Sequence, residues 1–245
     1  MSVSSHMTAK PKKRKSSPQP ADTKKSSDSG GRRILVVDDH PIMRQGLASL
    51  INSEPDMNVC GEAETVGDAL TMVEDIKPDL VITDISLPGR NGLELIKDLQ
   101  AVQATLPVLA LSMHDETLYA ERVLRAGGRG YIMKQEGGLK LIEAIRRVLD
   151  GQIHVSEKMS SRILEMFSGK RGQAAKSPME RLTDREFEVF ELLGQGLGTR
   201  EVAERLNLSV KTIEVHRGHI KQKLGAKSAP DLVRQAVRWV ETEHG

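Results

Sequence analysis

Short apolar runs alternate with amphipathic segments between residues 34 and 151, and this alternation constrains the fold more than any other feature. The runs are ILVVD, MNVCGEA, LVITD, LPVLALS and GYIM, and the amphipathic segments cover 42–53, 66–75, 92–102, 116–125 and 138–150. Strands that alternate with helices are joined by right-handed crossovers, so the strands lie parallel and helices cover both faces of the sheet. The pattern therefore predicts an α/β domain with a five-stranded parallel sheet.

Polar residues follow these runs at the carboxyl ends of the predicted strands, where such folds place their functional sites. Asp38 and Asp39 follow the first run, Asp84 ends the third, Ser112 ends the fourth and Lys134 follows the fifth. Adjacent carboxylates raise each other's pKa unless a cation lies close to them. Carboxylates with no obvious thiol or imidazole among them suit a hard ion, so the sequence predicts a Mg²⁺ site.

These residues together predict chemistry on a phosphoryl group. The carboxylate of Asp84 would accept the group, while the metal and the ammonium of Lys134 neutralise the developing charge and Ser112 donates a hydrogen bond. Each residue also has an ordinary alternative, because Asp84 could cap the turn LPGRNG and Lys134 could be a solvated residue at a helix start. Their common position at the strand ends of one sheet favours the site.

Composition excludes two classes of protein. The chain has 245 residues and one cysteine, Cys60, which excludes a disulfide framework. No apolar run approaches the length that crosses a bilayer, and the first 31 residues lack the apolar core of a signal peptide. We therefore expect a cytoplasmic protein of a reducing compartment that has no membrane partner.

Charge is distributed unevenly and divides the chain into four predicted parts. Residues 1–31 form a Ser-, Lys- and Pro-rich tail with seven basic and two acidic residues, which we predict to be disordered. The α/β domain, 32–152, has 13 basic and 19 acidic residues. A basic linker with a short helix, 153–178, leads to a second domain, 179–245, with 11 of each. Domains with different partners fit this asymmetry.

The second domain has the pattern of a small all-α helix-turn-helix domain. Thr183, followed three residues later by Glu186, forms a capping box that opens a helix. A second helix and a tight turn follow, and Ser209 caps a third helix predicted from 210 to 224. That helix carries four basic residues and one acid, Glu214, which suits the major groove of DNA, although a solvated face is the alternative. A fourth helix is predicted over 229–240.

The first domain resembles the receiver domain of two-component response regulators in the stretches VVDDHP, DLVITDISLPGRNGLE, LALS and GGRGYIMK. The resemblance implies a flavodoxin-like, doubly wound sheet and phosphorylation of Asp84 by a sensor histidine kinase. It also implies that Mg²⁺ is held at Asp84 by Asp38, Asp39 and the backbone carbonyl of Ser86.

The resemblance gives roles to further residues around the phosphoryl group. Ser112 and Lys134 would contact the phosphoryl oxygens as catalytic residues. Tyr131 would be an aromatic switch that moves inward together with Ser112, with simple packing at a strand edge as the alternative. From its position two residues beyond Ser112, His114 is predicted to flank, with Ser86, the path of water to the phosphoryl group. A change of His114 should therefore alter the rate of autodephosphorylation without abolishing phosphorylation. A solvent-exposed histidine is the alternative at this position.

The second domain resembles the LuxR-type output domain in LTDRE, GLGTREVAERL and SVKTIEVHR…KLGAKS, so the chain resembles a NarL/FixJ-type response regulator. This implies transcription regulation through double-stranded DNA, and a homodimer when the protein is phosphorylated or DNA-bound. The implied phosphate contacts are Lys211, Thr212, His216, Arg217 and Lys221, and the implied contacts to base edges are Glu214 and Val215. An intrahelical ion pair with Lys211 or Arg217 is the alternative for Glu214.

Two rival functions use parts of the same sequence. An aspartate-based phosphohydrolase also forms an acyl phosphate, but such enzymes typically need a second acid two residues after the nucleophile, where this chain has Ser86. A protein-interaction output domain would keep the receiver and lose DNA binding. We therefore expect no enzymatic activity beyond autodephosphorylation.

Overall fold

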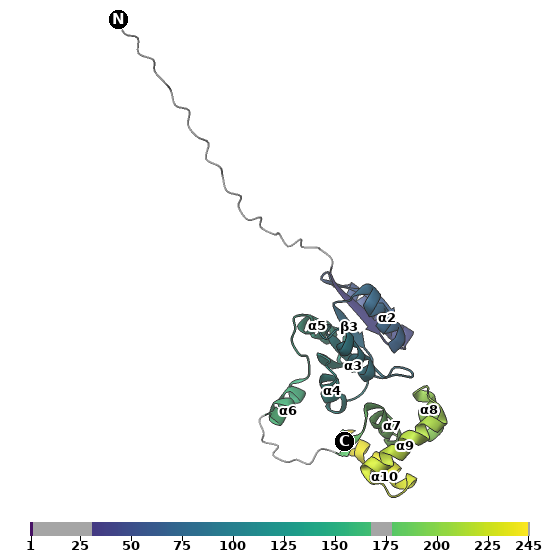
Figure 1. The fold of residues 1–245 in the computed structure, drawn as a ribbon. Helices are drawn as coiled ribbons and strands as arrows, with labels where there is room; N and C mark the ends of the chain where they lie inside the picture. The colour runs from purple at the N-terminus through teal and green to yellow at the C-terminus, as the bar shows by residue number, and fades with distance from the viewer. Residues whose placement is uncertain (2–30, 168–177, 245) are drawn as a thin grey trace.

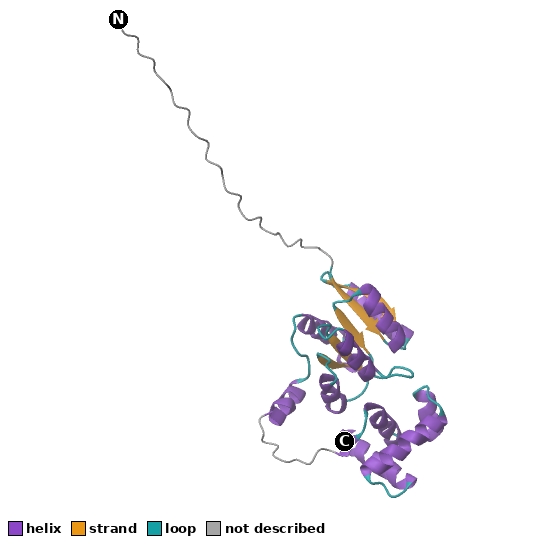
Figure 2. Ribbon diagram, in the orientation of Figure 1, coloured by secondary structure: helices purple, strands orange, loops and turns teal. Residues whose placement is uncertain are grey.

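The five predicted strands form one parallel sheet in the order β2-β1-β3-β4-β5 (Figures 1 and 2). The structure is a computed structural model and describes residues 1, 31–167 and 178–244. The predicted tail, apart from its two ends, and the linker residues 168–177 lie outside the described residues. The strands are β1 (Arg32–Val37), β2 (Met57–Ala63), β3 (Leu80–Thr83), β4 (Val108–Ser112) and β5 (Gly130–Met133).

Five helices cover the two faces of this sheet, as the α/β prediction requires. Side chains along a strand point alternately to opposite faces. In β1, Ile34 and Val36 therefore enter the core under α1 and α5, whereas Leu35 and Val37 enter the core under α2, α3 and α4. The helices are α1 (Pro41–Asn52), α2 (Val66–Ile76), α3 (Gly92–Val102), α4 (Glu116–Arg125) and α5 (Gly138–Leu149).

Element boundaries differ from the predicted ones at a few ends. β1 begins before the apolar run, because Arg32 and Arg33 continue the ladder by pairing with Met57 and Asn58. α1 begins at Pro41, where the fixed φ of proline suits the first helical turn and the missing N–H costs nothing. The last helix continues past the predicted end at residue 240 and ends at residue 244.

The second domain is all helical and follows α6 (Glu157–Phe167) (Figure 1). The predicted capping box is present, since Thr183 Oγ1 accepts from the Glu186 N–H and the Glu186 carboxylate accepts from the Thr183 N–H. Ser209 caps the third predicted helix as expected. The elements are the 3₁₀ turn η2 (Pro178–Arg181), α7 (Asp184–Gly194), α8 (Thr199–Arg205), α9 (Val210–Leu224) and α10 (Ala229–His244).

Aromatic side chains tie α7 to α10 in the core of the second domain. Trp239 packs edge-on to Phe187, with 5.3 Å between the ring centroids, and also contacts Phe190. Ile213 and Ile220 of α9 are fully buried in the same core, so one side of that helix is fixed against the domain. The opposite side of α9 is therefore the one available to a partner.

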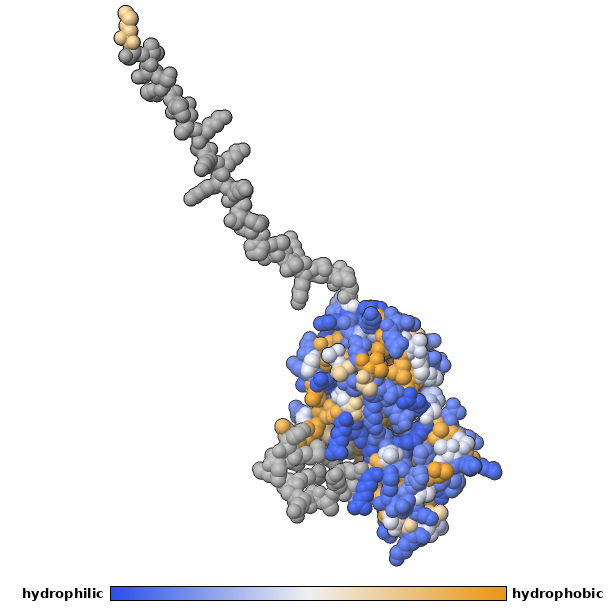
Figure 3. Space-filling view, viewed as in Figure 1, coloured by the Kyte–Doolittle hydropathy of each residue, from blue (hydrophilic) through white to orange (hydrophobic). Residues whose placement is uncertain are grey.

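The outer surface in the view of Figure 3 is largely hydrophilic, with smaller hydrophobic patches. Among the residues that the structure describes, no helix has the length and apolar character needed to span a bilayer.

Candidate functional site

Three carboxylates lie together beyond the carboxyl ends of β1 and β3. β1 ends at Val37, directly before Asp38 and Asp39, and β3 ends directly before Asp84. The backbone N–H of Asp84 donates to the carbonyl of Val37 at 2.8 Å, which brings the two strand ends side by side. Asp38 and Asp84 are buried and Asp39 is partly exposed. The sheet therefore assembles the acidic group that the sequence predicted.

One buried ammonium bridges two of these carboxylates. Lys134 Nζ lies 2.6 Å from Asp38 Oδ2 and 2.7 Å from Asp84 Oδ2. Burial lowers the pKa of Lys134, but the charges and hydrogen bonds of Asp84 and Asp38 outweigh this, so the pKa is raised. Lys134 is therefore charged at neutral pH and is positioned beside the carboxylate predicted to accept a phosphoryl group.

The cluster also contains an imidazole, so the expectation of carboxylates without one was wrong. His40 Nδ1 lies 3.1 Å from Asp38 Oδ1 and 2.7 Å from Asp39 Oδ1. The backbone N–H of His40 also donates to Asp38 Oδ1 at 2.8 Å, so the chain turns back on itself after β1 and brings the ring to the carboxylates. Ligand atoms of Asp38, Asp39, His40 and Asp84 all lie within 4.8 Å of one another.

The cluster fits a divalent cation. Asp39 Oδ1 is buried and makes no hydrogen bond, because its short approach to His40 lacks hydrogen-bond geometry. Burial raises the pKa of Asp39, His40 opposes this rise, and the charges of Asp38 and Asp84 add to it. A cation would supply both the absent partner and the compensating charge. Carboxylate oxygens are the ligands that Mg²⁺ prefers, so the residues present fit this ion.

Two residues outside the predicted site hold its loops in place. Arg44 of α1 is buried, donates to the backbone carbonyl of Asp38 at 2.6 Å and pairs with Glu64. A Cβ atom at Gly92 would overlap the carbonyl oxygen of Asp84, so only glycine permits α3 to start there. The sequence analysis missed Arg44. Arg44 precedes Leu47 by three residues, so both lie on the buried face of the predicted helix, and a basic residue on that face was a signal of a buried partner.

The predicted switch residues lie on β4 and β5. Ser112 is fully buried, and its Oγ accepts from the backbone N–H of His114 at 3.2 Å. Tyr131 is 1% exposed, and its hydroxyl donates to the carbonyl of His114 at 2.7 Å. Burial raises the pKa of Tyr131 well above its usual value, so its hydroxyl stays a donor. Both side chains therefore meet the loop after β4.

His114 is not the solvent-exposed histidine of the alternative interpretation. Its side chain is 16% exposed, and its Nε2 lies 2.8 Å from Ser86 Oγ. The Ser86 N–H donates to Asp84 Oδ1 at 3.2 Å, so His114 is linked to the predicted phosphoacceptor through one residue. On its other side, His114 Nδ1 lies 3.2 Å from Glu191 Oε1 of α7. Burial lowers the pKa of His114, and Glu191 more than offsets this, so the pKa is raised.

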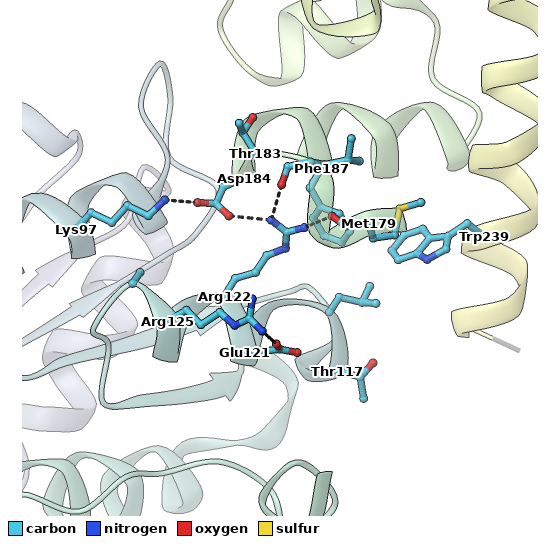
Figure 4. Close-up of a pocket in the computed structure, with 13 residues that line it drawn as sticks. Lys97, Thr117, Glu121, Arg122, Arg125, Met179, Thr183, Asp184, Phe187 and Trp239 are labelled. Carbon is cyan, nitrogen blue, oxygen red and sulfur yellow. Dashed lines mark hydrogen bonds and ion pairs between the residues drawn. The ribbon is translucent and has the colours of Figure 1, made fainter. Parts of the chain in front are cut away.

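The contact with Glu191 belongs to a docked interface between the two domains. Asp184, at the start of α7, accepts from Arg122 of α4 at 2.9 Å and from Lys97 of α3 at 2.6 Å (Figure 4). Arg122 also lies 4.2 Å from the ring centroid of Phe187. A cavity of about 370 Å³ remains between the domains, with Trp239 in its wall. Sequence reasoning missed this interface, because no local pattern marks contacts between residues so far apart in the chain.

The predicted DNA-contacting residues divide into two sets on α9. Four are exposed, namely Lys211, Glu214, Val215 and Lys221. Glu214 forms an ion pair of 3.3 Å with Arg217, which is the intrahelical pair of the alternative interpretation.

The other set lies partly against its own domain. Thr212 Oγ1 is 2.7 Å from Ser209 Oγ, and Arg217 donates to Thr199 at the start of α8. His216 is half-buried, and burial together with the charge of Arg185 lowers its pKa, so it is neutral at pH 7.

Family models match two separate parts of the chain. Residues 34–146 match the family model of the response regulator receiver domain, and residues 180–236 match that of the bacterial regulatory proteins of the luxR family. The oxygen regulatory protein NreC of Staphylococcus carnosus (strain TM300) is 37% identical over 210 residues, which cover 84% of this chain and 97% of NreC.

Solved structures of the response regulator RcsB are similar to most of this chain. RcsB from Salmonella enterica serovar Typhimurium, bound to promoter rprA in the presence of the phosphomimetic BeF3⁻, is 27% identical with a TM-score of 0.56, covering 84% of this chain and 98% of that one. A structure of two RcsB dimers bound to two parallel DNAs is 28% identical with a TM-score of 0.51, covering 84% and 97%.

A doubly wound sheet with an acidic cluster at its strand ends, joined to a helix-turn-helix domain, defines a two-component response regulator with a DNA-binding output. The chain belongs to the NarL/FixJ-type response regulators.

Proposed function

We propose that a sensor histidine kinase phosphorylates this regulator on Asp84 and thereby controls its sequence-specific binding to DNA. The observation that carries the assignment is the bridging ammonium of Lys134, which joins Asp84 and Asp38 at the strand ends. A carboxylate is a competent nucleophile toward phosphorus, and the ammonium beside it would stabilise the charge that develops during the transfer.

The proposed step transfers a phosphoryl group between two side chains. A carboxylate oxygen of Asp84 attacks the phosphorus, and the bond between phosphorus and the histidine nitrogen of the kinase breaks. The electron pair of that bond returns to the imidazole of the kinase. Lys134 and the hydroxyl of Ser112 bind the phosphoryl oxygens and stabilise their charge.

Mg²⁺ is the proposed cofactor of this step. Asp38, Asp39, Asp84 and the backbone carbonyl of Ser86 would hold it, and it would neutralise the charge that develops on the phosphoryl oxygens. With Ser86 in place of the second acid of phosphohydrolases, we propose no activity beyond autodephosphorylation. Tyr131 is the proposed switch residue, moving with Ser112.

The proposed output is a DNA complex of a homodimer in the bacterial cytoplasm, where DNA is available. The receiver comprises residues 32–152 and the output domain residues 179–245, joined by the linker 153–178 after a basic tail, 1–31. On α9, base edges are read by Glu214 and Val215, and backbone phosphates are bound by Lys211, Thr212, His216, Arg217 and Lys221. The DNA-bound RcsB dimers support the dimer.

Phosphorylation from acetyl phosphate tests the assignment of Asp84. With Mg²⁺ present, intact-mass spectrometry should find one phosphoryl group on the wild type and none on Asp84→Asn, because an amide is not a competent nucleophile here. Asp39→Ala and metal chelation should also abolish the reaction. The matched control is Asp98→Asn, an aspartate of α3 away from the strand ends, which should react like the wild type. Full labelling of Asp84→Asn would contradict the assignment.

A further inference from the structure

The imidazole of His40 lies in the acidic cluster, although the proposed phosphoryl transfer gives it no role. Its Nδ1 is 2.7 Å from Asp39 Oδ1 and 3.1 Å from Asp38 Oδ1. This nitrogen adds an atom of a different chemical class to a cluster whose other candidate ligand atoms are oxygens. The surroundings of the ring therefore indicate what the cluster can bind besides Mg²⁺.

The backbone places the ring of His40 beside the carboxylates. His40 directly precedes α1 and has an extended conformation, with φ −90° and ψ 109°. Its backbone N–H donates to Asp38 Oδ1 at 2.8 Å, which folds the chain back over the end of β1. Within the described residues, the ring makes no hydrogen bond that caps α1. The position of the ring therefore serves the cluster and not the start of the helix.

The spacing of these atoms suits ligands that share one ion. Neighbouring ligands of an octahedral ion with bonds of about 2.1 Å are separated by about 3 Å. The two distances from His40 Nδ1 to the carboxylate oxygens lie close to this value. Ligand atoms of Asp38, Asp39, His40 and Asp84 also lie within 4.8 Å of one another, so a single ion can contact all four residues.

One of these close approaches is not a hydrogen bond. Asp39 Oδ1 is buried and makes no hydrogen bond to any described residue, although His40 Nδ1 is 2.7 Å away. Buried oxygens normally have a partner, so this atom requires an explanation. An ion bound by both atoms would supply a partner to the oxygen and would account for their short separation.

The buried ammonium of the site leaves this position open. Lys134 Nζ contacts Asp38 Oδ2 and Asp84 Oδ2, whereas His40 Nδ1 faces Oδ1 of Asp38 and Oδ1 of Asp39. An ion on the side of His40 would therefore use different oxygens from those that bind Lys134. The side chain of His40 is 65% exposed, so solvent reaches the ring and water ligands can complete the coordination.

We propose that His40 is a nitrogen ligand of the ion held at this cluster, so that the site binds divalent transition-metal ions as well as Mg²⁺. The inference rests on the proposed metal site of Asp38, Asp39 and Asp84. A neutral imidazole with its proton on Nε2 presents the lone pair of Nδ1 to an ion. Imidazole suits ions such as Ni²⁺, Fe²⁺ and Zn²⁺, whereas oxygen ligands suit Mg²⁺ and Mn²⁺. His40 is then the residue that determines which ions compete with Mg²⁺ here.

Pulsed electron paramagnetic resonance of bound Mn²⁺ tests ligation directly in the full chain. Mn²⁺ is paramagnetic and occupies the same octahedral oxygen sites as Mg²⁺. The spectrum of the wild type should show coupling to a directly bound nitrogen, and His40→Ala should lose this coupling. A wild-type spectrum without nitrogen coupling would overturn the inference, as would coupling that persists in His40→Ala.

The matched control removes a histidine from the other domain. His219 lies on α9 and is exposed, so His219→Ala takes away one imidazole and leaves the cluster intact. This variant should keep the nitrogen coupling of the wild type. If His219→Ala loses the coupling, the nitrogen does not come from the cluster and the inference is wrong.

Binding affinities measured by isothermal titration calorimetry test the choice of ion. His40→Ala should weaken Ni²⁺ binding by about tenfold, the lower end of the range for loss of a group that supports a metal site. Mg²⁺ binding should change much less, because Mg²⁺ gains little from a nitrogen ligand. Equal losses for the two ions would show that His40 does not select between them. Tighter binding of both ions by His40→Ala would show that the ring occupies the place of the ion. Either result would overturn the inference.

Failure of the inference and failure of the proposed metal site give different results. Asp39→Ala should weaken the binding of both Ni²⁺ and Mg²⁺. If the wild type and Asp39→Ala bind the ions equally well, the proposed metal site fails and the inference fails with it. If binding depends on Asp39 and His40→Ala behaves like His219→Ala, only the inference fails.

Discussion

Asp38 is bound by two buried cations through different atoms. Lys134 binds its carboxylate, whereas Arg44 binds its backbone carbonyl. The ammonium is a compact charge that can turn toward a new anion, and the planar guanidinium suits a fixed arrangement of several acceptors. Lys134 is therefore able to take part in chemistry while Arg44 holds the loop.

Glu214 offers a test of base reading against charge balance at a single residue. If its carboxylate accepts a hydrogen bond from cytosine, Glu214→Ala should relax preference at one base pair by about 1–3 kcal/mol and leave the salt dependence unchanged. The expected outcome is this relaxation, measured by binding-site selection followed by salt titration of affinity.

Lys221→Ala is the matched control on the same helix. It should weaken binding to every sequence and lower the salt slope by about one, because one phosphate contact is lost. If Glu214→Ala instead tightens binding to all sequences, the pair with Arg217 is the whole role of Glu214.

At the scale of elements, the eleven residues of α7 take part in a helix cap, in the core of the output domain and in contacts with the receiver. Its start is capped by Thr183, its apolar residues Phe187 and Phe190 fill the core of the output domain, and its charged residues dock on the receiver. A helix buried on nearly all sides normally lacks charge. Here the buried charges have partners on other elements as well as on α7 itself, so α7 links two domains.

The pH dependence of stability tests one of these partners. Burial raises the pKa of Glu186, but hydrogen bonds from Lys223 and Thr183 outweigh it, so the pKa lies below its ordinary value of 4.5. A lowered pKa gives stability that is present above pH 4.5 and lost as the pH falls through the folded-state value. Urea unfolding of the full chain should therefore show a smaller acid-side loss for Glu186→Gln than for the wild type.

The control for this measurement is Glu204→Gln, which alters an exposed glutamate of α8. It should keep the acid-side loss of the wild type. An unchanged loss in Glu186→Gln would show that the ion pair of 2.5 Å with Lys223 does not contribute.

At the scale of the whole molecule, the two domains are joined by ion pairs and hydrogen bonds as well as by packing of Tyr119 against Phe187. Asp184 pairs with both Lys97 and Arg122, and Arg122 also donates to the carbonyls of Met179 and Leu182. Relative motion of domains within one chain is the usual expectation unless their interface is large and hydrophobic. The charged contacts of Asp184 are therefore a place at which the docking of the two domains can be tested.

Asp184→Asn should shift the molecule toward the open arrangement. The variant keeps the shape of the side chain but removes the charge that two cations share, so the radius of gyration from small-angle X-ray scattering should increase. Asp98→Asn, which breaks an ion pair with Arg90 inside the receiver, should leave the radius unchanged. A wild-type radius for Asp184→Asn would show that the remaining contacts are sufficient for docking.

Local sequence patterns are sufficient to predict the sheet, the helices and the acidic residues of the site. The spacing of apolar residues identifies strands and helices, because side chains return to the same face every second residue in a strand and about every 3.6 residues in a helix. The capping residues Thr183 and Ser209 each bind a backbone N–H three residues further along the chain, so their effect is also local. The carboxyl ends of parallel strands meet at one edge of the sheet, so the order of the residues along the chain already places Asp38, Asp84 and Lys134 together.

The residues that surround this site depend on tertiary packing. His40 joins the carboxylates through a turn of the backbone, and Arg44 of α1 donates to the backbone carbonyl of Asp38. Glu191 contacts His114 from the other domain. His114 and Glu191 are separated by 77 residues, and a contact over that distance leaves no mark in the local pattern. Such contacts form only when complete helices and strands pack together, because a buried charge then finds its partner on a different element.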